Sequence, residues 1–418
     1  MIVKSFLLKK ETIQRIAALC DKDTVAVVRP EKQIETILRD AIRKTIHEKK
    51  SASEEIARVR AYFESLGGSE AFQARATQII DSISAYLKEG MYVMTSQIAI
   101  QDYVLARCAR LCAEAVNDRV GGVILDGTEL MICHEDAKGV QHFDWLASQG
   151  QISSRIPAEG PVVISGGYGR LDSGYIVRVG KDGAHLMASL IGSTLKASSI
   201  VFFIEGRGID GLPAVTYDEA AHFCASERAP FASSAIWPAK KGEIPILVKD
   251  IQDTSFEGTI ISTGSAHKRE VIWDKDLTLV TVYGTGLLGR VGMSSSIFSC
   301  LAKAGVNVRF IAQTSSEYSI SFAVRSADKE RTQEALGGLF KDNPLLPLDD
   351  VVVLNKEVGI VTVFGSRMRN LPGTSGQVFG ALGQAGINII ASAQGGEELS
   401  ISLVLEEADV EKAVQLLG

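Results

Sequence analysis

The sequence predicts an α/β protein in which helices sandwich a mainly parallel sheet, followed by two copies of a small βαββα unit. Two observations predict this arrangement. Short β-branched runs alternate with helical stretches over residues 1–265, as in sheets that helices cover on both faces. In the remaining part, residues 307–324 recur 81 positions later as residues 388–404, which indicates an internal duplication.

The first part opens with a strand at residues 2–3 and a helix near residues 11–20. Residues 51–89 have the pattern of a polar-faced helix that is interrupted at Gly67-Gly68. The other expected elements are strands at 24–28, 122–126, 161–165, 201–204, 245–249 and 259–261, helices at 32–47 and 182–192, and a linker at 263–269.

Each repeat is expected to fold as strand, glycine-rich loop, helix, strand, strand and helix. In the first copy, glycines punctuate the loop up to Gly292, and Gly305 ends the first helix. The two copies keep one register, residues 279–313 matching residues 360–394 without a gap. The elements of the first copy are strands at 279–283, 306–312 and 318–324, and helices at 297–304 and 328–340.

A polar run from Gln313 to Glu317 interrupts the strands of the first repeat. Its backbone donors and hydroxyls could hold a small zwitterion. The simpler interpretation is a turn closed by serine and threonine side chains. The sequence alone leaves both interpretations open.

Composition excludes several classes of partner. A net charge of −6 with 46% apolar and 22% charged residues gives no sign of nucleic-acid or membrane-surface binding. No apolar run approaches about 18 residues, and the charged N-terminal segment is unlike a signal peptide, so we expect a cytoplasmic protein. Six cysteines without framework spacing fit reduced thiols there. Cys108-x-x-x-Cys112 with Cys133-His134 matches no zinc pattern, and no metal is expected.

Three segments of the repeats, residues 311–322, 367–373 and 393–394, carry a family pattern. With them, the repeats resemble the tandem ACT domains of aspartokinases. The resemblance is closest to the kinase half of bifunctional aspartokinase–homoserine dehydrogenases. It implies two ferredoxin-like ACT domains, at residues 275–345 and 350–418, and a homodimer formed through them.

The same resemblance implies an amino-acid effector, threonine or lysine. In this sequence the effector-binding positions are Gln313, Ser315, Ser316, Glu317 and Gln394. The second copy departs from the family, because Gly395-Gly396-Glu397 stands where Gly-Ser-Ser is usual.

Residues 1–265 resemble an amino-acid kinase domain of the aspartokinase type, through residues 2–16, 166–192 and 215–236. The resemblance implies a three-layer sandwich with a mainly parallel sheet. It also places the nucleotide-binding remnant in the glycine-rich segment, at Gly166, Gly180, Lys181 and Gly183.

The catalytic motifs of that family are degenerate here. Phosphoryl transfer to a carboxylate needs cations and bare backbone on the phosphates. The family's Lys-Phe-Gly-Gly-Thr-Ser reads Ser5-Phe6-Leu7-Leu8-Lys9-Lys10, so Ser5 replaces the lysine and two leucines replace the glycine turn. Arg29-Pro30 stands where the family has Ser-Ala.

Further motifs depart in the same way. Gly-Arg-Gly-Gly-Ser-Asp reads Gly180-Lys181-Asp182-Gly183-Ala184-His185, and we expect Asp182 to cap the following helix. Thr-Asp-Val-Asp-Gly keeps one acid as Glu205 and has Arg207 at the other. The later Gly-Ala-Lys-Val-Leu-His-Pro-Arg has lost its lysine, histidine and arginine in residues 227–234, and Val93-Met94 replaces Gly-Glu.

These losses predict a catalytically impaired kinase domain that senses an amino acid and regulates a partner, such as an active aspartokinase. The alternative is an active aspartate kinase that uses MgATP to phosphorylate L-aspartate. A third hypothesis is a repurposed site built from Lys181, His185, Glu205 and Arg207. The simpler interpretation of His185 is a helix-surface histidine.

Overall fold

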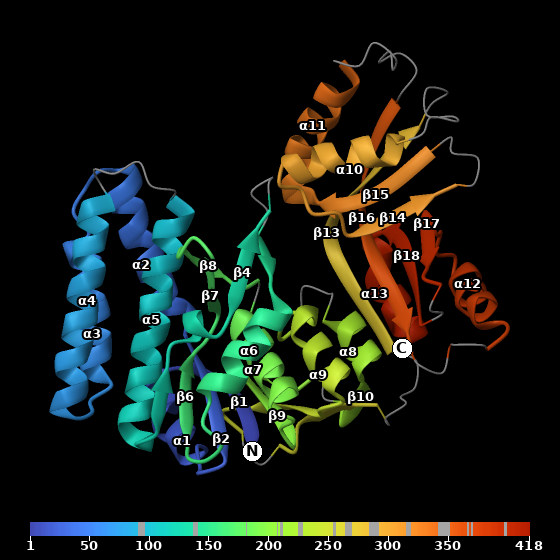
Figure 1. The fold of residues 1–418 in the computed structure, drawn as a ribbon. Helices are drawn as coiled ribbons and strands as arrows, with labels where there is room; N and C mark the ends of the chain where they lie inside the picture. The colour runs from blue at the N-terminus through green and yellow to red at the C-terminus, as the bar shows by residue number, and fades with distance from the viewer. Residues whose placement is uncertain are drawn as a thin grey trace. The chain divides into compact units, whose positions relative to one another are not determined.

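The computed structural model contains two compact units, unit 1 at residues 1–265 and unit 2 at residues 266–418 (Figure 1). It describes the whole chain except residues 91–96, 137–140, 181, 207, 210–211, 225–228, 254–255, 264–269, 284–291, 315–318, 342–351, 366–367, 369–370 and 397–398. Among the described residues, no helix has the length and apolar character needed to cross a lipid bilayer.

Unit 1 is built on an eight-stranded sheet with the strand order β10-β12-β11-β9-β1-β2-β6-β3. Every neighbouring pair is parallel except β11 with β12. Its strands are β1 (Ile2–Leu8), β2 (Thr24–Pro30), β3 (Val123–Leu125), β6 (Val162–Ser165), β9 (Ser199–Ile204), β10 (Ala214–Thr216), β11 (Ile246–Asp250) and β12 (Thr259–Ser262).

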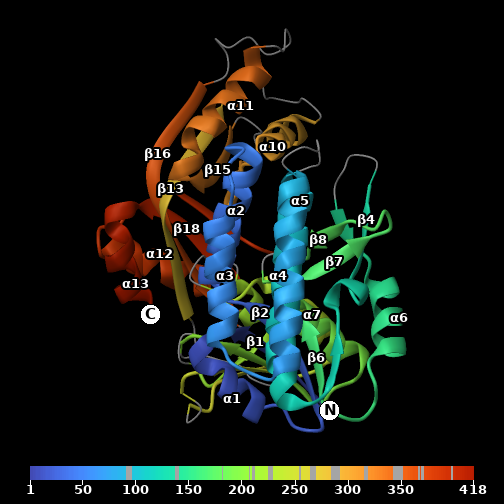
Figure 2. The same cartoon turned by 90° about the vertical axis from the view of Figure 1, so that its left-hand side faces the viewer.

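Helices cover both faces of this sheet, because side chains alternate between the faces along each strand. On β1, Phe6 and Leu8 enter one apolar cluster and Val3 enters the other. The first face carries α1 (Ile13–Ala18), α2 (Lys32–Ile42), α3 (Ser53–Ser65), α4 (Glu70–Gly90) and α5 (Gln97–Val120) (Figure 2). The second carries α6 (Trp145–Arg155), α7 (Gly183–Thr194), α8 (Tyr217–Phe223) and α9 (Trp237–Gly242). The predicted three-layer sandwich is confirmed.

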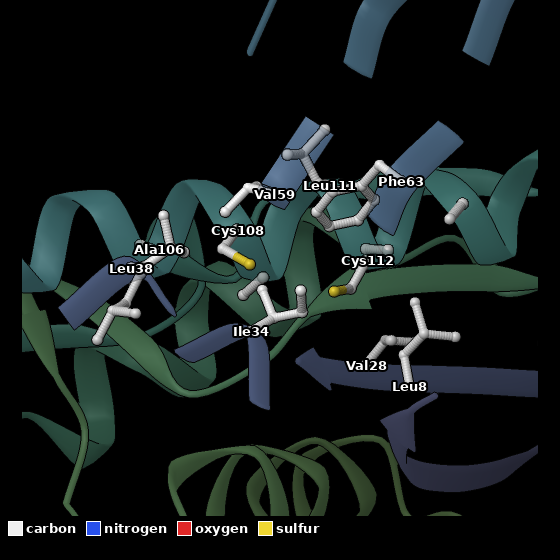
Figure 3. Packing of buried hydrophobic residues seen from close by; sticks show 14 of the residues in the cluster. Leu8, Val28, Ile34, Leu38, Val59, Phe63, Ala106, Cys108, Leu111 and Cys112 are labelled. Carbon is white, nitrogen blue, oxygen red and sulfur yellow. The ribbon is translucent and has the colours of Figure 1, made fainter. Parts of the chain in front are cut away.

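Two of the cysteines are buried in the first apolar cluster. Cys108 and Cys112 lie one turn apart on α5 and pack among Ile34, Val59 and Phe63 (Figure 3). Cys133 belongs to the cluster on the opposite face. The three thiols therefore act as small apolar side chains, two in one core and one in the other.

A second, four-stranded sheet of unit 1 was not predicted. Its order is β5-β4-β7-β8, and its strands have only three or four residues each. They are β4 (Ile132–Glu135), β5 (Gln141–Phe143), β7 (Tyr168–Leu171) and β8 (Ile176–Arg178).

Unit 2 contains a six-stranded antiparallel sheet with the order β14-β15-β13-β16-β18-β17. Each repeat buries its own apolar cluster between its strands and two helices. The elements are β13 (Glu270–Tyr283), α10 (Met293–Lys303), β14 (Phe310–Gln313), β15 (Ser319–Arg325), α11 (Lys329–Lys341), β16 (Val352–Phe364), α12 (Thr374–Gln384), β17 (Ala391–Gln394), β18 (Ser400–Glu406) and α13 (Val410–Leu417).

The two long strands serve both repeats. The first half of β13, up to Asp274, pairs with the second half of β16, and its second half, from Leu277, pairs with the first half. A register shift lies between Asp274 and Leu277, where Asp276 has a φ of 57°. Each repeat therefore gains its fourth strand from the other one, which gives two interlocked ferredoxin-like domains. The outer strands β14 and β17 contact each other, and a third apolar cluster lies on the face without helices.

The duplication is visible in matched contacts. Thr281 Oγ1 lies 2.9 Å from Ser321 Oγ, and the equivalent Thr362 Oγ1 lies 2.9 Å from Ser402 Oγ. Gly292 and Gly373, which precede α10 and α12, both have left-handed φ angles, 87° and 88°. The strand expected at 306–312 is shorter than predicted and begins at Phe310.

Candidate functional site

The candidate site of unit 1 lies where the carboxyl ends of the parallel strands β1, β2, β6 and β9 meet. In open α/β sheets this edge is where ligands bind. Lys9 follows β1, Arg29 lies at the end of β2, Gly166 follows β6 and Glu205 follows β9. Helix α7 packs on β1, β2 and β9, and its N-terminus faces this edge.

Glycines let the start of α7 approach the sheet closely. A Cβ on Gly166 would lie 2.7 Å from Val27 Cγ1 and 2.8 Å from Ala184 Cβ. A Cβ on Gly183 would lie 2.9 Å from the Gly167 carbonyl oxygen. Gly180 has a φ of 63°, a left-handed conformation that favours glycine. Gly166 and Gly183 are therefore needed by the packing of the helix, and Gly180 is favoured by its backbone conformation.

Asp182 does not cap α7 as expected. It occupies the N-cap position with a left-handed φ of 56°, and its side chain makes no capping hydrogen bond. Its Oδ1 instead lies 3.2 Å from Arg29 Nη1, with the two side chains 16% and 23% exposed. The prediction of a cap was wrong, because the left-handed backbone turns the carboxylate toward β2.

A second ion pair joins the ends of β1 and β9. Lys9 donates to Glu205, and this hydrogen bond raises the pKa of the Lys9 ammonium above its usual value. Lys4 precedes Ser5 in β1, so its side chain points to the opposite face of the sheet from that of Ser5. Its Nζ lies 3.1 Å from Thr24 Oγ1. The acid retained as Glu205 thus has a lysine partner within the chain.

Ser5 of β1 and His185 of α7 are both buried between the sheet and this helix. Ser5 has no exposed surface, and its Oγ has no hydrogen-bond partner among the described residues. The His185 ring lies 4.6 Å from the Phe202 ring and 5.8 Å from that of Phe231, measured between centroids. Ser5 is the sheet neighbour of Phe202.

The helix-surface interpretation of His185 was wrong, because only 1% of the residue is exposed. Neither ring nitrogen has a hydrogen-bond partner in the described part of the chain. Burial, with a contribution from the Arg29 charge, lowers the pKa of His185 well below its usual value. A neutral imidazole enclosed by phenylalanine rings cannot reach a substrate at the strand ends. Of the other members of the repurposed site, Glu205 is paired with Lys9, and Lys181 and Arg207 lie outside the described residues.

The described strand ends therefore hold paired charges. Two cations at these strand ends, Lys9 and Arg29, each have a carboxylate partner from this chain. From the sequence, Asp182 and Arg29 are departures from the family motifs and Glu205 is a retained acid. Their pairing was not predicted, since the partners are far apart in the chain.

In unit 2, the two glutamines predicted to bind an effector end the neighbouring strands β14 and β17. Gln313 and Gln394 are both exposed and occupy equivalent positions in the two repeats. Ser375, in the first turn of α12, donates a hydrogen bond of 3.2 Å to Gln394 Oε1. Ser315, Ser316, Glu317 and Glu397 lie outside the described residues.

Comparisons with known proteins match both units. The ACT domain family model matches residues 280–340 and 361–418. The bifunctional aspartokinase/homoserine dehydrogenase 1 of Zea mays, a chloroplastic protein, is 29% identical over 70% of this chain and 34% of its own length. E. coli aspartokinase III in complex with lysine and aspartate has a TM-score of 0.78 at 18% identity, covering 100% of this chain and 98% of that one. The Clostridium acetobutylicum aspartate kinase gives 0.76 at 18% identity, covering 100% and 99%.

These findings define a protein with an amino-acid-kinase-like domain followed by two ACT domains. The chain is a relative of the aspartokinases. It spans about a third of the length of the first curated relatives that it matches, which are bifunctional proteins.

Proposed function

We propose that this chain is an aspartokinase-family protein of aspartate-derived amino-acid biosynthesis, with an impaired kinase site and ACT domains that sense an amino acid. The observation that carries the proposal is the pair of ion pairs at the strand ends, Lys9 with Glu205 and Arg29 with Asp182. They neutralise, within the chain, the cations that a nucleotide would need.

The described residues do not fit MgATP at this edge. A helix N-terminus attracts a phosphate through its free N–H groups and its dipole. Here the Asp182 carboxylate stands at the first turn of α7, and a phosphate would have to displace it from Arg29 against like-charge repulsion. Leu7 and Leu8 add side chains where close backbone approach would be required. We derive no phosphoryl transfer through this site.

The sensing part of the proposal rests on unit 2. Gln313 and Gln394 are exposed at the ends of adjacent strands, with amide groups available to a ligand. E. coli aspartokinase III, which shares the fold, is known in complex with lysine and aspartate. We propose threonine or lysine as the effector and an active aspartokinase as the regulated partner. The homodimer through the ACT domains, the domain limits 1–265, 275–345 and 350–418, and the cytoplasmic location stay predictions.

A thermal-shift titration of the full chain tests both parts. Threonine and lysine should raise the melting temperature, because a ligand that binds only the folded state stabilises it by mass action. MgATP, with or without aspartate, should leave it unchanged. Gln313→Ala should weaken the amino-acid shift more than Gln394→Ala does, since the second repeat departs from the family pattern. Gln384→Ala, an exposed glutamine on α12, is the matched control.

The second candidate is an active aspartate kinase. The retained close packing of Gly166 and Gly183 favours it, because the backbone platform at the start of α7 is preserved. A coupled assay of ADP release with L-aspartate distinguishes the candidates. Aspartate-dependent turnover, together with a MgATP shift in melting temperature, would overturn the impaired-kinase proposal and leave the amino-acid sensing intact.

A further inference from the structure

A cavity of about 270 Å³ lies in the helical layer of unit 1, on the sheet face opposite α7. Helices α3 and α4 lie side by side in this layer (Figure 2). Residues at the start of α3 and near the end of α4 line the cavity. Buried apolar side chains of Ala52, Ile56 and Leu87 form part of its lining. The volume is below the usual range for drug-sized ligands, so only a small molecule fits.

The polar part of the lining is basic and hydroxylated. Lys50 and Lys88 contribute ammonium groups, and Ser53 and Ser84 contribute hydroxyls. Lys88 forms no ion pair with any residue that the structure describes, and Lys50 Nζ lies 3.1 Å from the exposed Glu48. Within the described lining, no side chain is acidic.

Two further carboxylates near the cavity are paired with a lysine outside its lining. Glu55, in the first turn of α3, is bonded to Lys44, and Glu54 lies 4.0 Å from the same ammonium group. Lys50, which is paired with Glu48, and Lys88 are the charged side chains of the described lining, and both are exposed to solvent. Their attraction for an anion is weaker in solvent than it would be in a buried site, so the apolar wall must add to the binding.

The backbone around the cavity is unusual in two places. Residues 43–47, which include the lining Thr45, form a π-helical turn, a feature that often marks functional sites. Lys49 has a φ of 52°, a strained conformation for a residue with a side chain. Both backbone irregularities lie beside the cavity, and we interpret them as features that shape it for a ligand.

We propose that this cavity binds a small organic anion, with a carboxylate or phosphate head between Lys50 and Lys88 and an apolar body against Ala52, Ile56 and Leu87. The site is separate from the strand ends and from the ACT domains, and it does not depend on the proposed function.

The test is calorimetric titration of the full chain with hexanoate, hexyl phosphate, inorganic phosphate and hexan-1-ol. One of the two amphipathic anions should bind at least tenfold more tightly than hexan-1-ol or inorganic phosphate, and the comparison of the two identifies the head group. Lys50→Met with Lys88→Met should weaken that binding at least tenfold, because methionine keeps the apolar stem and removes the charge. Lys32→Met, an exposed lysine on α2, should leave it unchanged.

Several outcomes would overturn the proposal. These are no binding of either amphipathic anion, equal binding of hexan-1-ol, equal binding of inorganic phosphate, or full binding by the double lysine variant. Ile56→Trp, which fills the cavity, should abolish binding while circular dichroism reports an intact fold. If that variant unfolds, the lysine pair still decides the question.

Discussion

Asp182 Oδ1 lies 3.2 Å from Arg29 Nη1, so the start of α7 has a carboxylate and its counter-ion supplied by the chain itself. Anions are stabilised at helix N-termini by the dipole and the free N–H groups. The Asp182 carboxylate makes no hydrogen bond to those N–H groups, but it places a negative charge beside the position where a diffusible anion would be favoured. Arg29 and Asp182 are 153 residues apart in the chain, and their pairing ties β2 to α7.

Replacing Arg29 should destabilise unit 1, because it leaves Asp182 largely buried without its partner. We expect Arg29→Met to lower the free energy of unfolding by about 1–3 kcal/mol, less than for a fully buried pair because both groups retain some solvent contact. Urea unfolding measures it. Lys240→Met removes one partner of the exposed pair with Asp218 and should change stability by less than about 1 kcal/mol. Equal effects of the two substitutions would contradict a special role for Arg29.

Gly166 should tolerate no larger residue, for a reason of packing. Gly166→Ala places a methyl group within 2.8 Å of both Val27 Cγ1 and Ala184 Cβ. We expect a loss of about 1–3 kcal/mol, the usual cost of overpacking a core. Gly150→Ala, within α6 and with no atom within 4 Å of the new Cβ, should instead stabilise the protein by up to about 1 kcal/mol. Thermal unfolding of the two variants checks the contrast, and a neutral Gly166→Ala would contradict the close approach of α7.

His185 should make unit 1 sensitive to acid. Its pKa is depressed in the folded protein by burial, so below the ordinary histidine pKa of about 6.5 the unfolded state binds the additional proton. Stability should then rise with pH up to about 6.5 and level off above it, by at most about 1.4 kcal/mol per pH unit from this group. Urea unfolding at several pH values measures the slope.

Two variants isolate the contribution of His185. His185→Leu should reduce the slope below pH 6.5 and raise stability by about 1–2 kcal/mol, because two buried nitrogens without partners are removed. His47→Leu, at an exposed position at the end of the π-helical turn, should leave the slope unchanged. An unaltered slope in His185→Leu would show that the histidine is not buried as the structure has it.

More of the fold than of the site could be predicted, because the fold follows from contiguous sequence patterns and the site depends on contacts between distant residues. The parallel sheet and the duplication follow from local runs and from a repeat of 81 positions, both present in contiguous sequence. The sheet β5-β4-β7-β8 was missed, since strands of three or four residues do not show a strand period. The burial of His185 depends on Phe202 and Phe231, and no local spacing indicates that these rings enclose it.

The ion pairs, like the burial of His185, could not be predicted from local sequence. Asp182 stands before a helix as a cap would, and only its left-handed φ and the position of Arg29 reveal another role. The division of this segment into degenerate positions and retained glycines stays a prediction. Motifs alone do not show that Lys9 and Glu205 form a pair across β1 and β9, because strand order is a property of the folded sheet.

His134 should respond to pH in the opposite sense from His185. Its Nε2 lies 2.5 Å from Asp144 Oδ2 and its Nδ1 lies 2.5 Å from Asp172 Oδ2, so the imidazole bridges the start of α6 and the end of β7. The hydrogen bond to Asp144, followed by that to Asp172, raises the pKa of His134 above its usual value. The bridge is complete only when both ring nitrogens carry protons.

The contribution of this bridge should therefore be fully present below the unfolded histidine pKa of about 6.5 and be lost as pH rises through the higher folded value. An NMR titration of the His134 ring should give a pKa above the ordinary histidine value of about 6.5. Asp172→Asn should lower the pKa of His134. Asp144→Asn should lower the pKa of His134 more, because the hydrogen bond to Asp144 is the larger cause of the raised value. This variant also weakens the cap on α6. A His134 pKa that neither substitution lowers would show that the bridge does not form in solution.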